Sequence, residues 1–151
     1  MNTLRHVVGV TVVFVLALLQ AAGQAGVDFK HVVLMPSDLM WVDNATRPGQ
    51  LRAVLFGDPN KSGPFTQRVR FPPNTLNPPH THPDNRQVTV LSGTWYVGQG
   101  NRVEREKATK LLPGTFFTEP GGEVHWEFTG AEEVVAQASG TGPTATDYVK
   151  Q

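Results

Sequence analysis

The sequence predicts a small all-β domain, a sandwich or barrel built from short strands. The 151 residues include 15 glycines and 12 prolines, which interrupt long helices and favour many short elements joined by turns. From Val27 onward no helical periodicity lasts beyond about two turns, whereas apolar and polar residues alternate within short segments. Both observations point to strands rather than helices.

The expected strands follow one another with turn residues between them. Leu51, Ala53 and Leu55 share one face of a strand over 50–56, which ends at the turn signal Gly57-Asp58-Pro59. Similar short segments predict further strands at 65–71, 88–91, 94–97, 111–112, 115–118, 124–128 and 134–138. One short helical turn is expected at 38–42, a loop bracketed by proline pairs at 72–79, and a charged loop or hairpin edge at 102–110.

The N-terminal residues 1–25 have the pattern of a secretory signal peptide. A slightly basic start precedes an apolar run at 7–19, and small residues follow up to Ala25. The run is shorter than the roughly 20 residues of a membrane-spanning helix. We expect cleavage after Ala25, or alternatively after Ala22, and export to the periplasm or the medium. An uncleaved N-terminal anchor is the other interpretation. A single domain over 26–151, with no stable membrane span after cleavage, is then expected.

Charge and cysteine content exclude several classes of function. Lys and Arg total 13 and Asp and Glu total 13, so the formal net charge is zero and no general attraction to nucleic acid or anionic lipid is expected. The chain has no cysteine, which excludes disulfides and thiol chemistry without fixing the compartment.

Three histidines form the most informative pattern. His80 and His82 lie two residues apart, so on an extended chain their imidazoles share a face. A sheet that closes on itself can bring His125, in a later strand, opposite that pair. Neutral imidazole suits transition metals, so we predict one divalent ion: Zn, Fe, Mn, Ni or Cu. The alternatives are an exposed histidine pair at a strand end and a partly buried, hydrogen-bonded His125.

The surroundings of these histidines resemble the two conserved boxes of the cupin superfamily. The chain reads HTHPDNRQVTVLSG from His80 and GTFFTEPGGEVHWEFT from Gly114. The matching positions are His80, His82 and Gly93 in the first box, and Gly114, Pro120, Gly122 and His125 in the second. The resemblance implies a double-stranded β-helix, or jelly-roll barrel, with a metal ion held inside by the three histidines. It also implies a homodimer.

Two positions depart from the cupin pattern. Arg86 stands where the first box has a glutamate, and Thr129 where the second has an asparagine. A guanidinium has donors only and cannot ligate a cation, but it can bind an organic anion as substrate. Alternatively Arg86 is a surface residue or pairs with Asp84. Gln87 becomes a fourth ligand if the strand bulges by one residue.

Glu127 has the same strand parity as His125. It therefore points inward as a ligand or base, or lies at the rim as a solvated carboxylate.

Three functions are compatible with this sequence. The first is a metal-dependent enzyme, which by resemblance is an oxygenase or an isomerase/decarboxylase acting on an organic acid or diketone. The second is a barrel that binds or senses a small ligand without turnover, with or without metal. The third is a structural barrel with vestigial histidines. The fold alone does not choose among them.

Overall fold

The computed structural model describes residues 30–45 and 47–150. The predicted signal peptide and its cleavage site lie outside the described residues, so export stays a prediction, as does the homodimer. In the described ranges no helix is long and apolar enough to cross a membrane.

The all-β prediction is confirmed. Two short 3-10 turns, η1 (Pro36–Asp38) and η2 (Arg105–Lys107), are the helical elements of the described residues. The strands are β1 (Val42–Asp43), β2 (Leu51–Phe56), β3 (Gly63–Phe71), β4 (Leu76–Thr81), β5 (Arg86–Ser92), β6 (Trp95–Gln99), β7 (Thr109–Leu111), β8 (Phe116–Glu119), β9 (His125–Thr129), β10 (Val134–Gly142) and β11 (Asp147–Tyr148).

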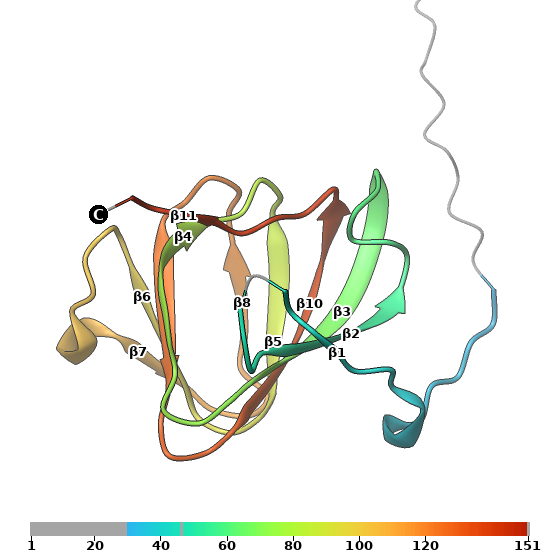
Figure 1. Cartoon of the computed structure of the whole chain (residues 1–151), viewed down its shortest axis with the longest axis horizontal. Coiled ribbons are helices and arrows are strands. Elements are labelled where there is room, and N and C mark those ends of the chain that lie inside the picture. Colours follow the sequence, from blue (N-terminus) through green and yellow to red (C-terminus); the bar gives the residue numbers. More distant parts are fainter. Residues whose placement is uncertain (1–29, 46, 151) are drawn as a thin grey trace, which may run out of the picture.

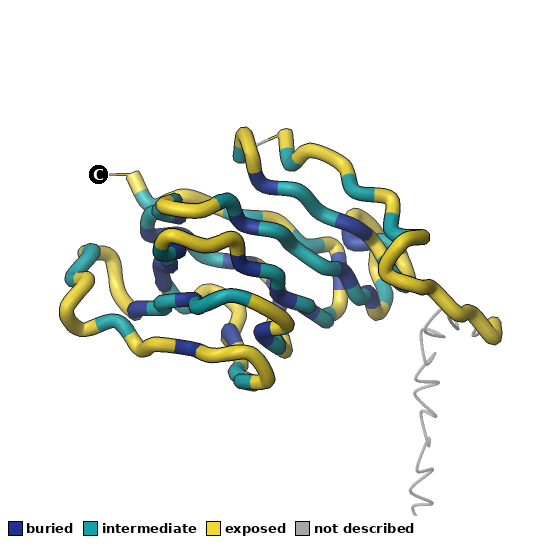
Figure 2. Tube along the Cα trace, turned by 90° about the horizontal axis from the view of Figure 1, so that it is seen from below, coloured by how far each residue is buried: buried dark blue, intermediate teal, exposed yellow. Residues whose placement is uncertain are grey.

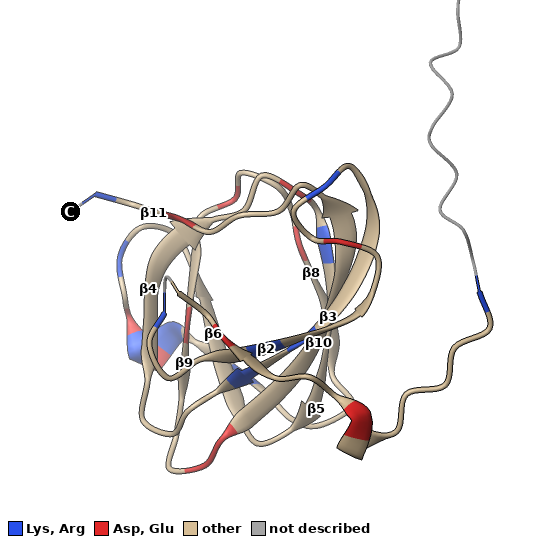
Figure 3. Ribbon diagram, turned by 45° about the vertical axis from the view of Figure 1, so that its right-hand side comes forward, with Lys and Arg blue, Asp and Glu red and all other residues tan. Residues whose placement is uncertain are grey.

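The strands form two antiparallel sheets that enclose one interior. The first sheet has the order β1-β2-β3-β10-β5-β8, and the second has the order β11-β4-β9-β6-β7. Figures 1 and 3 show the two sheets curved around a common axis, as in a jelly-roll barrel. Residues distant in sequence are thereby neighbours: β4 and β9 pair in one wall, while β5 lies between β8 and β10 in the other.

The most consequential difference from the expected elements is at 72–79, where part of the expected loop is strand. β4 includes Pro78 and Pro79, and its register with β9 shifts by one residue there. Asn77 lies opposite Glu127, but His80, three residues on, lies opposite His125. Proline has no N–H to donate, so a bulge is where a strand tolerates it. The extra residue lets Asn77 and His80 face the interior together, and both are buried.

The stretch 102–110 agrees with the expected loop or hairpin edge. η2 and the start of β7 lie in it, and β7 pairs with β6 at the edge of the second sheet.

An apolar core lines one part of the interior. Its buried side chains are Phe71, Val88, Val90, Trp95, Leu111, Val134, Ala136 and Ala138. Figure 2 shows buried residues alternating with more exposed ones along the strands, as period-two side-chain geometry requires. The same strands continue beyond this core with further inward-facing positions. At the other end of the interior these positions hold polar side chains.

Candidate metal centre

The three histidines converge from two paired strands. His80 lies near the end of β4, His82 directly follows that strand, and His125 begins β9. Their ring centroids are 4.8 Å apart for His80 and His82, 4.3 Å for His80 and His125, and 5.0 Å for His82 and His125. One ligand nitrogen from each lies within 4.8 Å of the other two, and all three residues are buried. The expected convergence is therefore present.

Each imidazole is oriented by a main-chain carbonyl. Nδ1 lies 2.8 Å from the Pro78 carbonyl in His80, 2.7 Å from that of Ala145 in His82, and 3.1 Å from that of Glu123 in His125. A carbonyl only accepts, so each Nδ1 carries the proton and donates it. Nε2 then keeps its lone pair. A hydrogen bond from one ring nitrogen that fixes the tautomer of the other is characteristic of metal-ligating histidines.

Burial keeps His80 and His82 uncharged. Loss of solvation lowers the pKa of His80 to about 3, and the neighbouring His125 lowers it further. Loss of solvation lowers the pKa of His82 to about 2, assisted by the positive charge of Arg86. Both imidazoles are therefore neutral at neutral pH, which is the form that binds a metal ion.

Two buried carboxyl groups face the histidines. Oε2 and Oε1 of Glu119 lie 3.7 Å from Nε2 of His82 and of His125, respectively. Oε2 of Glu127 lies 3.8 Å from Nε2 of His80. Burial raises the pKa of both carboxyls, and the pKa of Glu127 reaches about 8 with a further contribution from Glu119. Glu127 therefore points inward, and it is not a solvated carboxylate at the rim.

Sequence reasoning missed Glu119. The predicted strand ended at residue 118, whereas β8 includes Glu119. Phe117 and Glu119 share a face, and the strand becomes more buried toward its end. If the predicted strand had been extended by one residue, up to Pro120, the alternation of side chains would have placed Glu119 on the inward face.

The donor set fits a divalent ion. Nε2 of His125 and Oε2 of Glu127 are buried without a hydrogen-bond partner among the described residues. Imidazole nitrogens and carboxyl oxygens thus face each other at 3.7–3.8 Å, too far for a hydrogen bond. Two ligands of one ion at about 2.1 Å are roughly 3–3.4 Å apart, so small side-chain shifts bring these atoms to ligand distances. A cation between them would satisfy Nε2 of His125 and Oε2 of Glu127, whereas Nε2 of His80 also lies 3.4 Å from the side-chain amide nitrogen of Asn77.

Arg86 lines the interior but is tied to the chain around it. Its Nε lies 3.3 Å from Oδ2 of Asp84, and its Nη2 donates to the Ala145 carbonyl at 3.0 Å and to the Thr144 hydroxyl. The expected pairing with Asp84 is therefore present. The Ala145 carbonyl is also the acceptor for Nδ1 of His82, so Arg86 helps to hold the group that orients this histidine.

The structure does not bring Gln87 to the cluster. Its side chain is exposed, on the face of β5 opposite to Arg86 and Val88. The register between β5 and β10 is unbroken from Arg86 to Val90, so the bulge that would turn Gln87 inward is absent there. Gln87 is therefore not a ligand in this arrangement, and the fourth-ligand prediction is corrected.

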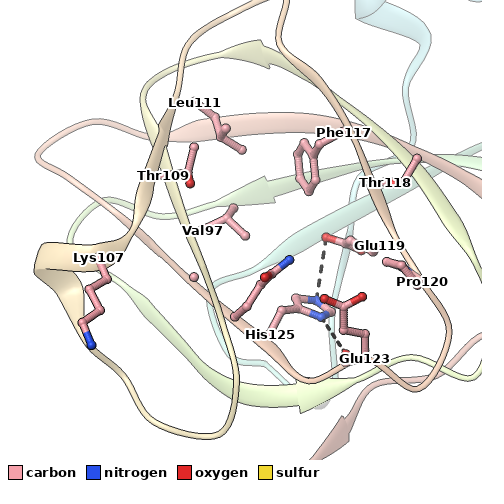
Figure 4. A pocket seen from close by; sticks show the side chains of 12 residues that line it. Val97, Lys107, Thr109, Leu111, Phe117, Thr118, Glu119, Pro120, Glu123 and His125 are labelled. Atoms are coloured by element: carbon pink, nitrogen blue, oxygen red, sulfur yellow. Dashed lines mark hydrogen bonds and ion pairs between the residues drawn. The ribbon is translucent and has the colours of Figure 1, made fainter.

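The cluster separates two pockets. One, of about 430 Å³, includes His125 with the apolar side chains of Val97, Leu111 and Phe117 (Figure 4). The other, of about 300 Å³, lies in the barrel interior and includes His80 and His82. Pocket size does not identify the site, because the smaller pocket holds more of the converging polar groups. Glu119 lines both.

The family comparison and the curated relatives agree with this architecture. The family model described as ChrR Cupin-like domain matches residues 29–145. Putative germin-like protein 2-2 of Oryza sativa subsp. japonica is 42% identical over 84 residues, which are 53% of this chain and 38% of that protein. A probable germin-like protein, subfamily 2 member 5, of Arabidopsis thaliana is 38% identical over 69 residues, 45% of this chain and 32% of that protein. The chain spans about two-fifths of the length of the first of these relatives.

Solved structures show the same fold. The polyketide cyclase RemF from Streptomyces resistomycificus superimposes with a TM-score of 0.66 and 17% identity, over 81% of this chain and 87% of that one. A protein with a double-stranded β-helix domain from Klebsiella pneumoniae subsp. pneumoniae gives a TM-score of 0.59 and 18% identity, over 80% and 100%. At these identities the likeness shows the fold alone, and it confirms the predicted double-stranded β-helix.

Proposed function

Because the chain belongs to the ChrR cupin-like family, we propose that His80, His82 and His125 hold one divalent transition metal ion and that this site acts on a small organic anion. One observation supports the metal above all others. Three buried imidazoles give their Nδ1 protons to main-chain carbonyls and leave three Nε2 lone pairs within reach of one point.

The protein supplies a pre-organised donor set. His80 and His82 need no deprotonation at neutral pH, and the carbonyls of residues 78, 123 and 145 fix the orientation of the three imidazoles. Three protein ligands leave positions open for a substrate, as catalytic metal sites do. An ion bound there would act as a Lewis acid toward a substrate oxygen or support oxygen chemistry.

The interior pocket has the polarity expected for a small anion. Arg52 and Arg86 line it. So do Gln67 and Trp95, whose Oε1 acceptor and Nε1 donor are buried without partners among the described residues. Unpaired buried polar groups are costly unless a ligand or water pairs with them. A carboxylate or enolate with a neighbouring oxygen could use the cationic and hydrogen-bonding groups together.

The relatives are compatible with enzymatic activity. RemF is a polyketide cyclase, and an oxalate oxidase superimposes with a TM-score of 0.54 and 24% identity over 71% of this chain and 59% of that one. We propose that this chain turns over an organic acid or a diketone, by an oxygenase or an isomerase/decarboxylase reaction.

A barrel that binds its ligand without turnover is the second candidate. It is favoured by Arg86, which stands at the position of the cupin glutamate and is held by Asp84 and residues 144–145. On this alternative the pocket would hold an anion with or without a metal.

Elemental mass spectrometry tests the metal proposal. The chain beginning at Gly26, purified without a His tag or chelator, should contain close to one equivalent of a transition metal. A His80→Ala/His82→Ala variant should contain almost none. His31→Ala is the matched control, because His31 is exposed and outside the cluster, and it should retain the metal.

Equal metal in the double variant and the parent would refute the shared site. So would the absence of metal from the parent after incubation with excess Zn, Fe, Mn, Ni and Cu. The loaded protein is then assayed with small carboxylic acids and diketones. Binding without turnover across such a set would favour the second candidate.

A further inference from the structure

The metal centre lacks the carboxylate that the cupin pattern places on β5. Arg86 occupies that position, and its guanidinium is engaged by Asp84, Thr144 and the Ala145 carbonyl. Three imidazole ligands alone contribute no negative charge and would leave a divalent ion with its full charge in a buried setting, which is costly. We infer that Glu119 supplies the fourth ligand, so that the carboxylate has moved from β5 to the neighbouring strand β8. The inference rests on the proposed function, because it needs an ion at the three histidines.

The register of the sheet makes this exchange possible. β5 and β8 pair with Arg86 directly opposite Glu119. Facing residues of paired strands point to the same side of a sheet, and their Cβ atoms are about 4.5–5.5 Å apart. A carboxylate on β8 therefore reaches nearly the same part of the interior as one at position 86.

Both oxygens of Glu119 are directed at the cluster. Each lies 3.7 Å from Nε2 of a different histidine, His82 or His125. Among the described residues no N–H or O–H group donates a hydrogen bond to this carboxylate. The side chain is 9% exposed and lies at the boundary of the two pockets, where the histidines also lie. A buried carboxylate whose oxygens accept no hydrogen bond and face two imidazoles is placed to ligate a cation.

Glu127 is less suited to be that ligand. Its Oε1 accepts a hydrogen bond from the side-chain amide of Asn77, which in turn accepts one from the Tyr148 hydroxyl at 3.1 Å. Its remaining oxygen faces one histidine, His80, at 3.8 Å. Glu127 therefore belongs to a network that positions the His80 side of the cluster, whereas Glu119 spans the other two histidines.

Arg86 then acquires a positioning role. Its bond to the Ala145 carbonyl fixes the same oxygen that receives the Nδ1 proton of His82. On this inference Glu119 reaches the ion, and Arg86 secures the segment that orients His82.

The test compares Glu119→Gln with Glu127→Gln. Both changes are isosteric and remove a buried carboxyl, so each serves as the folding control of the other, checked by far-UV circular dichroism. Dissociation constants for Zn²⁺ and Co²⁺ are measured by competition with a chelator, and the visible spectrum of the Co²⁺ form is recorded. Glu119→Asp, which retracts the carboxylate by one methylene, is the second variant.

We expect Glu119→Gln to weaken metal binding by at least about tenfold more than Glu127→Gln does. The Co²⁺ bands should change in Glu119→Gln and Glu119→Asp and stay as in the parent in Glu127→Gln. A loss of affinity in Glu119→Gln no greater than in Glu127→Gln, or an unchanged Co²⁺ spectrum, would overturn the inference.

The histidine variant separates this inference from the proposed function. If His80→Ala/His82→Ala loses the metal while Glu119→Gln keeps the affinity and spectrum of the parent, the function stands and the Glu119 assignment fails. If the parent binds no metal, or the histidine variant binds as the parent does, the proposed function fails and the assignment fails with it.

Discussion

The two ends of the barrel interior use the same strands for opposite purposes. On β9, Thr129 lies opposite Trp95 in the ladder, at the level of the apolar core, whereas His125 lies opposite Gln99 at the other end. The first end buries Trp95, Val90 and their neighbours, and this burial stabilises the fold. The second end buries imidazoles and carboxyls that have few protein partners. Such groups cost stability when unpaired, and their presence at this end supports the proposed metal site.

Replacing Trp95 with alanine should have the largest effect on stability. Trp95 is 3% exposed, and its ring centroid is 4.8 Å from that of Phe71 and 5.7 Å from that of Phe117. Emptying such a site lowers the free energy of unfolding by about 3–5 kcal/mol. Urea denaturation followed by circular dichroism measures it. In chelator-treated protein, His80→Ala should cost much less, because it removes a desolvated polar group along with its packing. If the two substitutions lower the free energy of unfolding of the metal-free protein equally, then the histidine end contributes to stability as the apolar end does, and the comparison is wrong.

In the metal-free protein, lowering the pH should reduce the free energy of unfolding through the histidine end of the interior. The pKa values of His80 and His82 are lowered by burial to about 3 and about 2, while in the unfolded chain histidine titrates near 6.5. Below about pH 6.5 the unfolded state binds more protons than the folded state, so these histidines reduce stability as pH falls. From pH 7 to pH 5 we expect a loss on the order of 1–2 kcal/mol for each histidine.

Glu127 acts in the other direction over the same range. Its pKa is raised to about 8, so the folded state keeps a proton that the unfolded state loses above about pH 4.5. The measured quantity is therefore the difference between the parent and His80→Ala/His82→Ala, in which the Glu127 contribution largely cancels. Urea unfolding in the presence of a chelator at pH 7 and pH 5 gives this difference. A difference that does not change with pH would mean that the imidazoles are not held neutral by burial.

The sequence predicted most of the strands and the convergence of the histidines well, for a physical reason. Period-two alternation and turn residues are local signals, and they identified most strands and the shared face of His80 and His82. The cupin boxes added the position of His125. The proline pair 78–79 misled, because proline argues against a strand unless a bulge accommodates it, and bulges cannot be seen in sequence.

The carboxyls of the site could be predicted only in part. Glu127 followed from its parity with His125, but its burial depends on Asn77, which the bulge in β4 turns inward. Glu119 required the pairing of β8 with β5, a contact between segments more than 30 residues apart in sequence. Arg86 was placed correctly at the interior face. Its partners at 144–145 come from the C-terminal segment, whose path no local pattern specifies.

A smaller effect tests the outer face of the strand that carries His125. Gly98 of β6 pairs with Trp126, and a Cβ at position 98 would lie 2.1 Å from Cζ2 of the Trp126 indole. Trp126 is 1% exposed, so the ring has little room to move, and Gly98→Ala should cost about 1–3 kcal/mol of unfolding free energy.

Gly130→Ala is the matched control. Its Cβ would meet no atom closer than 3.9 Å, and neither glycine has a positive φ. Urea midpoints for the two variants measure the effect. Equal midpoints would show that β9 is not held by close packing behind His125, and the rigidity of the metal centre would then have to come from the carbonyls that bind the three Nδ1 atoms.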